Sequence, residues 1–297
     1  MNTTAVAVLG LGAMGLPMAT RLAAKFSVHG FDISTERMEL ASKAGIATFG
    51  SAREAVAGAD ALILAVRNGE QLNAVLFGEN GVAQHLKSGA VVILTSTVGL
   101  DAVPATAARL GELGVGLVDA PLSGGPVRAG EGDLLIVVGA EPGQLAKVRP
   151  VLDQLASTLS IVGDKPGDGQ ALKTVNQLLC GVHIAAAAEA LALADQLGLD
   201  QATTLDALQA GAAGSFMLGN RGPRMLEAYT EEGAEVLSRL DIFVKDLGIV
   251  TTAARALHLA TPVASAAEQL FLLGEAHGLA AADDSALIKV VAPKTGN

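Results

Sequence analysis

Short apolar runs alternate with segments of helical periodicity over the first half of the chain, up to about residue 163. The runs are too uniformly apolar to have a solvated face, which is typical of strands in a parallel sheet covered on both sides. We expect strands at residues 5–9, 28–31, 61–66, 90–94, 116–118, 134–138 and 159–162, with helices at 35–44, 51–57, 102–113 and 142–155. This alternation predicts a doubly wound α/β domain, whose ligands bind beyond the carboxyl ends of the strands.

The pattern changes after Gly163, where a turn-rich connector leads into a long stretch rich in Ala and Leu. This stretch, 170–197, predicts a long helix with Gly198 as its C-cap. Thr261 and Pro262 occupy the N-cap and first position of a later helix, and Asp283-Asp284 opens a last short one. In total we expect helices at 170–197, 200–210, 232–257, 262–276 and from 283 onward, and no strand after residue 163.

A glycine-spaced turn joins the first apolar run to the first helical segment. Gly10, Gly12 and Gly15 follow a predicted strand and open a predicted helix, the context in which Gly-x-Gly-x-x-Gly binds dinucleotide phosphates. The first glycine permits the tight turn, the second lets the backbone approach the pyrophosphate, and the third lets helix and strand pack closely. Free N–H groups at the helix N-terminus favour the same anion. The sequence therefore predicts a Rossmann-type domain that binds a nicotinamide dinucleotide.

Asp32 ends the second apolar run, 22 residues after Gly10. The acid that holds the adenosine ribose 2′-hydroxyl is expected about 20 residues after the first glycine. A carboxylate there repels a 2′-phosphate, which favours NAD over NADP. Two alternatives stay open: Asp32 caps the next helix instead, or the nearby Arg37 accommodates a 2′-phosphate.

Domain boundaries follow from these patterns. Residues 1–164 form the expected Rossmann-type domain, and residues 165–297 form an all-helical domain for substrate and oligomerisation. The long helix joins the two, and a cleft between domains is a common substrate site.

The composition of the chain argues against several classes of binding partner. The net charge of −10 argues against nucleic acid and anionic membrane surfaces. One cysteine, Cys180, excludes an internal disulfide framework and fits a reducing compartment. Uncharged apolar runs do not reach the roughly 18–20 residues of a membrane helix, and the first strand leaves no room for a signal peptide. We expect a cytoplasmic protein, without a metal site because its five histidines are scattered.

Three later motifs offer chemistry. Ser123, Gly124 and Gly125 follow the run at 116–118, where exposed N–H groups suit a carboxylate, although an ordinary glycine-rich turn fits equally well. Lys173 lies three and four residues before Asn176 and Gln177, so the three share one helix face. Desolvation in a cleft would lower the pKa of Lys173 and suit it to proton transfer, whereas the alternative is a solvated lysine. Lys245 and Asp246 interrupt an apolar helix, a pattern typical of a solvated face.

Together these motifs resemble those of the β-hydroxyacid dehydrogenases, which include 3-hydroxyisobutyrate dehydrogenase, tartronate semialdehyde reductase and L-threonate dehydrogenase. The matching segments follow in family order over essentially the whole chain, at 10–19, 119–125, 169–177, 245–247 and 285–289. Residues 76–81 and 236–248 look most like the L-threonate dehydrogenase branch, which oxidises four-carbon sugar acids at the 2-hydroxyl.

The resemblance implies a role for each matching residue. Lys173 is the catalytic residue, and Ser123, Gly124 and Gly125 bind the substrate carboxylate. Asn176 and Gln177 occupy amide-bearing positions, and which of them contacts substrate is open because many relatives carry asparagine at the second. Thr97 lies near the nicotinamide ribose, although Gly99-Leu100 replaces the Ser-Pro of many relatives. The implied cofactor residues are Gly10, Leu11, Gly12, Met14, Gly15, Asp32, Thr97 and Lys245.

The implied reaction transfers a hydride from a small hydroxy acid to NAD while Lys173 takes the hydroxyl proton. A four-carbon aldonate such as L-threonate matches best, and the acids of 3-hydroxyisobutyrate dehydrogenase and tartronate semialdehyde reductase are the alternatives. An imine reductase or a non-catalytic dinucleotide-binding module ranks lower, because each would be expected to lack Lys173. Asn220, Arg221 and Arg224 either serve a polyhydroxylated acid or lie at the surface. The family implies a homodimer or homotetramer.

Overall fold

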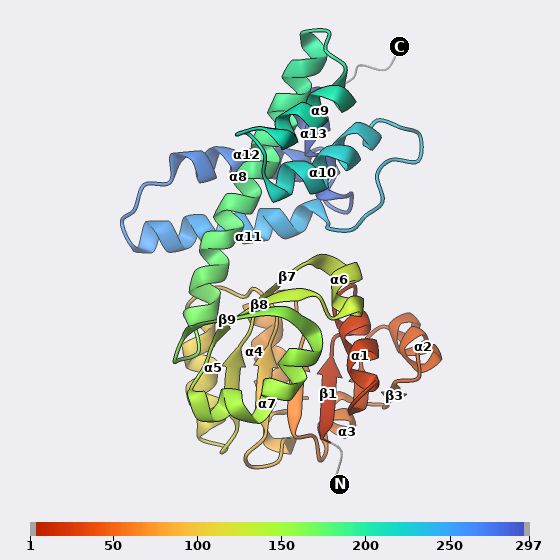
Figure 1. The fold of residues 1–297 in the computed structure, drawn as a ribbon. Coiled ribbons are helices and arrows are strands. Elements are labelled where there is room, and N and C mark those ends of the chain that lie inside the picture. The colour runs from red at the N-terminus through yellow and green to blue at the C-terminus, as the bar shows by residue number, and fades with distance from the viewer. Residues whose placement is uncertain (1–3, 294–297) are drawn as a thin grey trace. The chain divides into compact units, whose positions relative to one another are not determined.

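The N-terminal part of the chain is built on one large sheet, seen at the centre of Figure 1. In the computed structural model, which describes residues 4–293, the sheet has nine strands in the order β3-β2-β1-β4-β5-β6-β8-β7, with β9 paired to β8. The strands are β1 (Ala5–Leu9), β2 (Ser27–Phe31), β3 (Ala47–Thr48), β4 (Ala61–Leu64), β5 (Val91–Leu94), β6 (Gly116–Asp119), β7 (Leu122–Ser123), β8 (Leu134–Gly139) and β9 (Ala156–Gly163).

Strand direction divides this sheet into two parts. Every pair from β3 through β6 is parallel, as the apolar runs predict. Strand β8 is antiparallel to β6 and β7, and β9 is parallel to β8. The short strands β3 and β7 were not predicted, because two residues carry no periodicity. The predicted doubly wound α/β fold is confirmed.

Helices cover both faces of the sheet and explain why its strands lack a polar face. The helices are α1 (Gly15–Ala23), α2 (Thr35–Lys43), α3 (Ala52–Val56), α4 (Gly69–Phe77), α5 (Ala102–Gly111), α6 (Gly125–Glu131) and α7 (Pro142–Leu155). Successive residues of a strand point to opposite faces. Thus Val6 and Val8 pack into a core with residues of α1 and α7, whereas Ala7 and Leu9 pack into a second core with residues of α4 and α5.

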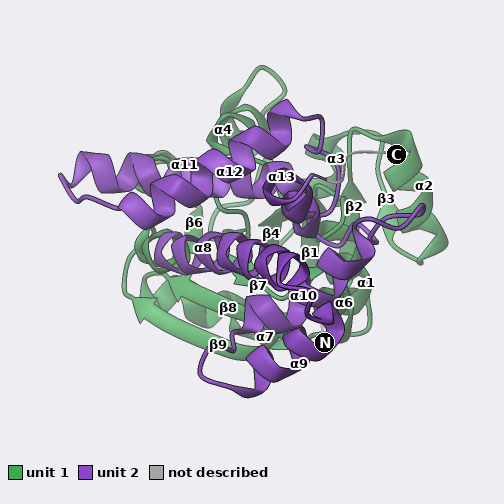
Figure 2. Cartoon of the chain, turned by 90° about the horizontal axis from the view of Figure 1, so that it is seen from above, with its two compact units in different colours: residues 1–173 green, residues 174–297 purple. Residues whose placement is uncertain are grey.

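Two compact units divide the chain after Lys173, and Figure 2 colours them separately. Helix α8 (Asp168–Gln196) begins in the first unit, residues 1–173, and continues into the second, residues 174–297. The second unit also contains α9 (Gln201–Ala210), α10 (Phe216–Glu227), α11 (Leu240–Ala256), α12 (Pro262–Ala276), the 3₁₀ turn Asp284–Leu287 and α13 (Ile288–Val291). Its core includes the stacked rings of Phe243 and Phe271, whose centroids are 5.3 Å apart.

The expected helix at 232–257 is wrong in its first third, because α11 begins only at Leu240. The N–H groups of Leu237 and Ser238 donate to the carboxylate of Asp283, and Arg239 forms an antiparallel β-bridge with Asp283. These contacts with a distant residue replace the hydrogen bonds of a helix. They are invisible to local periodicity.

Helices α4, α6 and α10 were missed altogether. Helix α10 contains two glycines and Pro223, residues that normally argue against a helix interior. Ser215 nevertheless caps it, since its hydroxyl accepts the N–H of Leu218 at 3.0 Å.

By length and composition alone, α8 is long and apolar enough to cross a membrane. Half of its apolar window is buried inside the structure, and Glu189 lies within the helix.

Candidate active site

The glycine loop has the geometry that its spacing predicts. Gly10 has a φ of +93°, and a Cβ atom there would overlap the carbonyl oxygen of Ala65. A Cβ atom on Gly15 would overlap the carbonyl oxygen of Gly10, so the start of α1 packs directly on the turn. At Gly12, by contrast, a Cβ atom would meet nothing within 4 Å. The loop therefore presents open backbone beside Gly12, as approach of a pyrophosphate requires.

Asp32 lies at the carboxyl end of β2, beside this loop. Its Oδ2 accepts the N–H of Leu11 at 2.6 Å, and its Oδ1 accepts the N–H of Ser34 at 2.8 Å. Helix α2 is capped by Ser34, whose hydroxyl accepts the N–H of Arg37 at 3.4 Å. The alternative that Asp32 is the cap of α2 is therefore wrong. The carboxylate instead holds the glycine loop.

Lys173 and Ser123 come together from segments 50 residues apart. The Lys173 Nζ donates to Ser123 Oγ at 2.9 Å. Ser123 ends β7, and the positive φ angles of Gly124 and Gly125 turn the chain into α6. Lys173 is only 7% exposed, so the alternative of a solvated surface lysine is wrong. The pair places an amino group and a hydroxyl group within hydrogen-bond distance of each other.

Asp119 and Gln170 connect the elements that carry these residues, and sequence reasoning did not single them out. The Oδ2 of Asp119 accepts the N–H groups of Gly167 (3.0 Å) and Gln170 (2.8 Å), and its Oδ1 accepts the side-chain amide of Gln170 (2.8 Å). Burial raises the pKa of the Asp119 carboxyl above its ordinary value, although hydrogen bonds from Gln170 and the neighbouring backbone oppose the shift. The sequence feature that could have identified Asp119 is its position as an acidic residue at the end of an apolar strand.

Gln170 also holds the loop that follows β5. Its Oε1 accepts the N–H of Val98 at 2.9 Å, and its Nε2 donates to the carbonyl of Ser96 at 3.0 Å. Thr97 lies between these two contacts. The loops after β1, β2, β5 and β6 thus gather Gly12, Asp32, Thr97 and Asp119 at one edge of the sheet, where doubly wound domains bind ligands.

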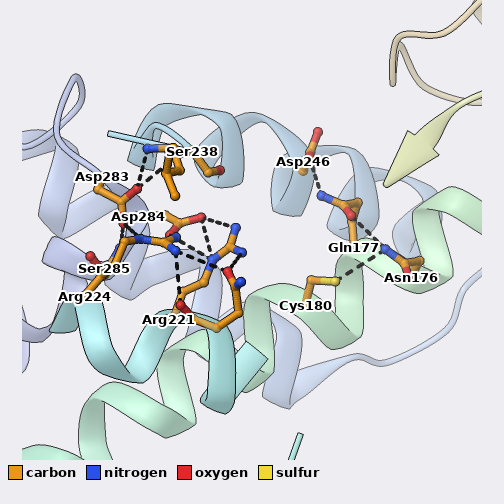
Figure 3. Close-up of polar contacts among 12 residues, drawn as sticks. Asn176, Gln177, Cys180, Arg221, Arg224, Ser238, Asp246, Asp283, Asp284 and Ser285 are labelled. Carbon is orange, nitrogen blue, oxygen red and sulfur yellow. Dashed lines mark hydrogen bonds and ion pairs between the residues drawn. The ribbon is translucent and has the colours of Figure 1, made fainter. Parts of the chain in front are cut away.

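In the second unit, the side chain of Gln177 is bound at both ends (Figure 3). Its Nε2 donates to Asp246 Oδ2, and its Oε1 accepts Asn176 Nδ2 at 2.9 Å. Asp246 also accepts Lys245 Nζ at 2.6 Å. Because Asp246 is buried, the interpretation of Lys245 and Asp246 as a solvated pair is wrong. The contact between Gln177 and Asp246 joins α8 to α11.

Arg221 and Arg224 belong to a buried ion-pair cluster (Figure 3). Arg221 Nη2 lies 2.8 Å from Asp284 Oδ2, and Arg224 Nε lies 2.9 Å from Asp283 Oδ1. Both guanidinium groups also donate to Asn220 Oδ1. The alternative that Arg221 and Arg224 lie at the surface is wrong, since their side chains are 12% and 10% exposed. Asn220 is exposed.

The fold and the glycine loop define a class, the nicotinamide-dinucleotide-dependent oxidoreductases with a Rossmann-type and a helical unit. The sequence profile described as the NAD binding domain of 6-phosphogluconate dehydrogenase matches residues 5–163. The profile described as NAD-binding of NADP-dependent 3-hydroxyisobutyrate dehydrogenase matches residues 167–291. The chain belongs to the β-hydroxyacid dehydrogenase family, in the branch that contains the L-threonate dehydrogenases.

Individual relatives match over nearly their whole length. The L-threonate dehydrogenase of Haemophilus influenzae is 38% identical over 98% of this chain and 97% of its own. The 2-hydroxy-3-oxopropionate reductase of Escherichia coli is 33% identical over 95% of each chain. A crystal structure of 3-hydroxyisobutyrate dehydrogenase from Salmonella typhimurium superposes with a TM-score of 0.88, at 37% identity, over 97% of this chain and 99% of the other. The predicted family and the nicotinamide dinucleotide cofactor are confirmed.

Proposed function

We propose that this enzyme oxidises a four-carbon aldonate such as L-threonate at its 2-hydroxyl, with NAD as cofactor. The observation that carries the proposal is the buried contact between Lys173 and Ser123 at the ligand-binding edge of a dinucleotide-binding sheet. The substrate is proposed from the relatives named L-threonate dehydrogenase, which match this chain along its length.

Lys173 is proposed to take the hydroxyl proton. Its contact with Ser123 Oγ fixes the amino group beside the turn of Gly124 and Gly125, where backbone N–H groups would bind the substrate carboxylate. The neutral amine takes the proton and becomes the ammonium. When bound, the nicotinamide supplies the hydride acceptor. A well-placed acid–base group contributes about 10²–10⁴ in rate.

The cofactor is proposed to contact the loop of Gly10, Leu11, Gly12, Met14 and Gly15 through its pyrophosphate. The open backbone beside Gly12 supports this. Asp32 is proposed to accept hydrogen bonds from the adenosine ribose, which favours NAD. Thr97 and Lys245 are assigned to the nicotinamide side from the family resemblance.

Asn176, rather than Gln177, is proposed to contact the substrate. Both ends of the Gln177 amide are engaged, by Asp246 and by Asn176. Asn176 donates to Gln177 and to Cys180, and its Oδ1 accepts no hydrogen bond from another described residue. Gln177 would then orient Asn176.

The assembly is proposed to be a homodimer or homotetramer in the cytoplasm. An apolar stripe formed by Val175, Leu179 and Leu193 on α8, and by Leu197 directly after it, is exposed in the single chain. These residues fall on one helix face by their spacing. A second copy of the chain would cover them.

Initial rates of NADH formation across a panel of hydroxy acids test the substrate. The panel holds L-threonate, D-threonate, erythronate, 3-hydroxyisobutyrate, D-glycerate and 3-hydroxypropionate, with NADP run in parallel. We expect threonate or erythronate with NAD to be preferred. Preference for 3-hydroxyisobutyrate or D-glycerate would contradict the aldonate assignment and keep the mechanism.

Lys173→Ala tests the catalytic role. We expect kcat to fall by about 10²–10⁴, while the Kd for NADH, measured by fluorescence, stays close to wild type. Lys147→Ala is the control, because Lys147 lies on α7 and its ammonium donates to the Gly89 carbonyl and to Gln144, outside the site described above. Normal turnover by Lys173→Ala would remove Lys173 from the mechanism.

A further inference from the structure

We propose that Asp119 and Gln170 are positioning residues that fix Lys173 and the backbone around Thr97 in one geometry. The inference rests on the proposed function in taking Lys173 as the proton acceptor. All of the contacts that carry it lie within residues 1–173.

The first observation is that Gln170 joins three separate segments. Its side-chain oxygen accepts Val98 N–H, and its side-chain nitrogen donates both to the Ser96 carbonyl and to Asp119. Every polar atom of this amide therefore has a partner, and Gln170 is 0% exposed. A fully satisfied buried amide has a single favourable orientation, because any rotation leaves buried groups unpaired. The amide locks the loop after β5 against the end of β6.

The second observation concerns the start of α8. The Asp119 carboxylate accepts the backbone N–H groups of Gly167 and Gln170, and it too is 0% exposed. These N–H groups lie at the helix N-terminus, where no preceding turn supplies acceptors. A carboxylate at this end is also favoured by the helix dipole. Asp119 thus anchors the first turn of α8 to the sheet, as a cap supplied by another element.

The anchored turn leads directly to Lys173. Lys173 follows Gln170 by three residues, so the two lie about one helical turn apart. A shift of the first turn would move the Lys173 ammonium relative to Ser123 Oγ, from which it is 2.9 Å away. The same amide holds the peptide groups on both sides of Thr97. A displacement of about 1 Å in a catalytic group costs about 10²-fold in rate.

The substitution Gln170→Leu tests the inference. Leucine keeps the volume and helix propensity but removes all three side-chain contacts. We expect kcat to fall by about 10–100-fold. KM for the acid and Kd for NADH should change by less than kcat does, because Gln170 is proposed to act through Lys173 and the loop of Thr97 and not on either ligand directly.

Gln154→Leu is the matched control. Gln154 is a buried glutamine of the same unit, on α7, and its amide donates to the Arg21 carbonyl at 3.3 Å. We expect a comparable loss of thermal stability with kcat within about twofold of wild type. If Gln170→Leu loses no more kcat than Gln154→Leu, the positioning role is wrong.

A second readout separates this inference from the proposed function. In protein labelled with ¹³Cε-lysine, the Lys173 resonance is assigned as the one absent from Lys173→Arg. We expect its shift and titration midpoint to change in Gln170→Leu and to stay unchanged in Gln154→Leu. An unchanged Lys173 resonance in Gln170→Leu would overturn the positioning role. If wild type oxidises none of the acids, the proposed function fails, and the resonance still decides this inference.

The milder substitution Asp119→Asn serves if Gln170→Leu does not fold. It keeps one oxygen acceptor and turns the other position into a donor that faces N–H groups. We expect kcat to fall by about tenfold and the Lys173 resonance to shift, as in Gln170→Leu. Wild-type kcat together with a wild-type Lys173 resonance in Asp119→Asn would equally overturn the inference.

Discussion

At the scale of single residues, Asp32 holds the glycine loop, and the same carboxylate is proposed to set the choice between NAD and NADP. Its oxygens accept Leu11 N–H and Ser34 N–H, so the negative charge stays at the carboxyl end of β2. A 2′-phosphate placed there would meet a like charge, which costs binding energy.

The substitution Asp32→Asn should therefore relax the preference for NAD. We expect the ratio of kcat/KM for NAD to that for NADP to fall by about tenfold or more, which corresponds to about 1.4 kcal/mol of lost discrimination. Asparagine keeps one oxygen to accept a backbone N–H, so the glycine loop is retained. Rates with both cofactors measure the ratio, and Glu39→Gln on α2 is the charge-matched control. An unchanged ratio would mean that Asp32 does not distinguish a 2′-hydroxyl from a 2′-phosphate on the adenosine ribose of the cofactor.

The sequence predicts a site residue more readily when the residues it contacts lie close to it along the chain. Gly10, Gly15 and Asp32 act within one strand–turn–helix unit, so local spacing was sufficient to find them. Lys173 was identified by resemblance and by its spacing to Asn176 and Gln177. Asp119 and Gln170 escaped because these contacts join residues 48 or more positions apart, and a single sequence without its fold does not show such pairs.

At the scale of elements, the segment before α11 shows how one buried residue overrides periodicity. Asp283 accepts hydrogen bonds from Leu237 N–H, Ser238 N–H and Ser285 N–H and pairs with Arg224. Burial alone would raise the pKa of Asp283, but the bonds from Ser285 and Arg224 outweigh it and lower the pKa below its ordinary value of 3.8. Burial of the neighbouring Asp284 dominates instead and raises the pKa of that carboxyl, despite Arg221.

We expect Asp283→Ala to destabilise the second unit by about 3–5 kcal/mol at pH 7, because it removes the buried carboxylate that pairs with Arg224 at 2.9 Å and leaves that guanidinium only the longer ion pair with Asp284. A carboxyl with a lowered folded-state pKa stabilises the fold above its unfolded pKa, and this contribution is lost as pH falls through the folded value. The difference between wild type and Asp283→Ala should therefore shrink below about pH 4.

Urea denaturation monitored by amide exchange in α10 measures this difference. Asp200→Ala is the control, since Asp200 is an exposed N-cap of α9 whose loss removes one capping hydrogen bond. A cost for Asp283→Ala no larger than that of Asp200→Ala, or one that grows on acidification, would contradict the account.

At the scale of the whole molecule, the class of fold was predictable because both sheet faces are buried, and continuous apolar strands reveal that directly. The reversed direction of β8 and β9 was not predictable, because an apolar run looks the same in a parallel and in an antiparallel strand. The assembly of the protein was not predictable from the sequence pattern either. Apolar periodicity on α8 does not tell which face packs inside the chain and which face remains exposed.

The structure resolves that ambiguity for α8 and leads to a prediction about assembly. Leu193 and Leu197 are 60% and 66% exposed, and with Val175 and Leu179 they form a stripe larger than scattered surface leucines would produce. If a second copy covers this stripe, a charge within it must be desolvated on association, which is unfavourable.

Wild type should then have a mass of two or four times 29.8 kDa in light scattering, and Leu193→Glu should shift it toward the monomer. Leu113→Glu, a similar change at the end of α5 in the first unit, should leave the assembly intact. A wild-type monomer, or a Leu193→Glu variant with wild-type mass, would show that the stripe is not the interface.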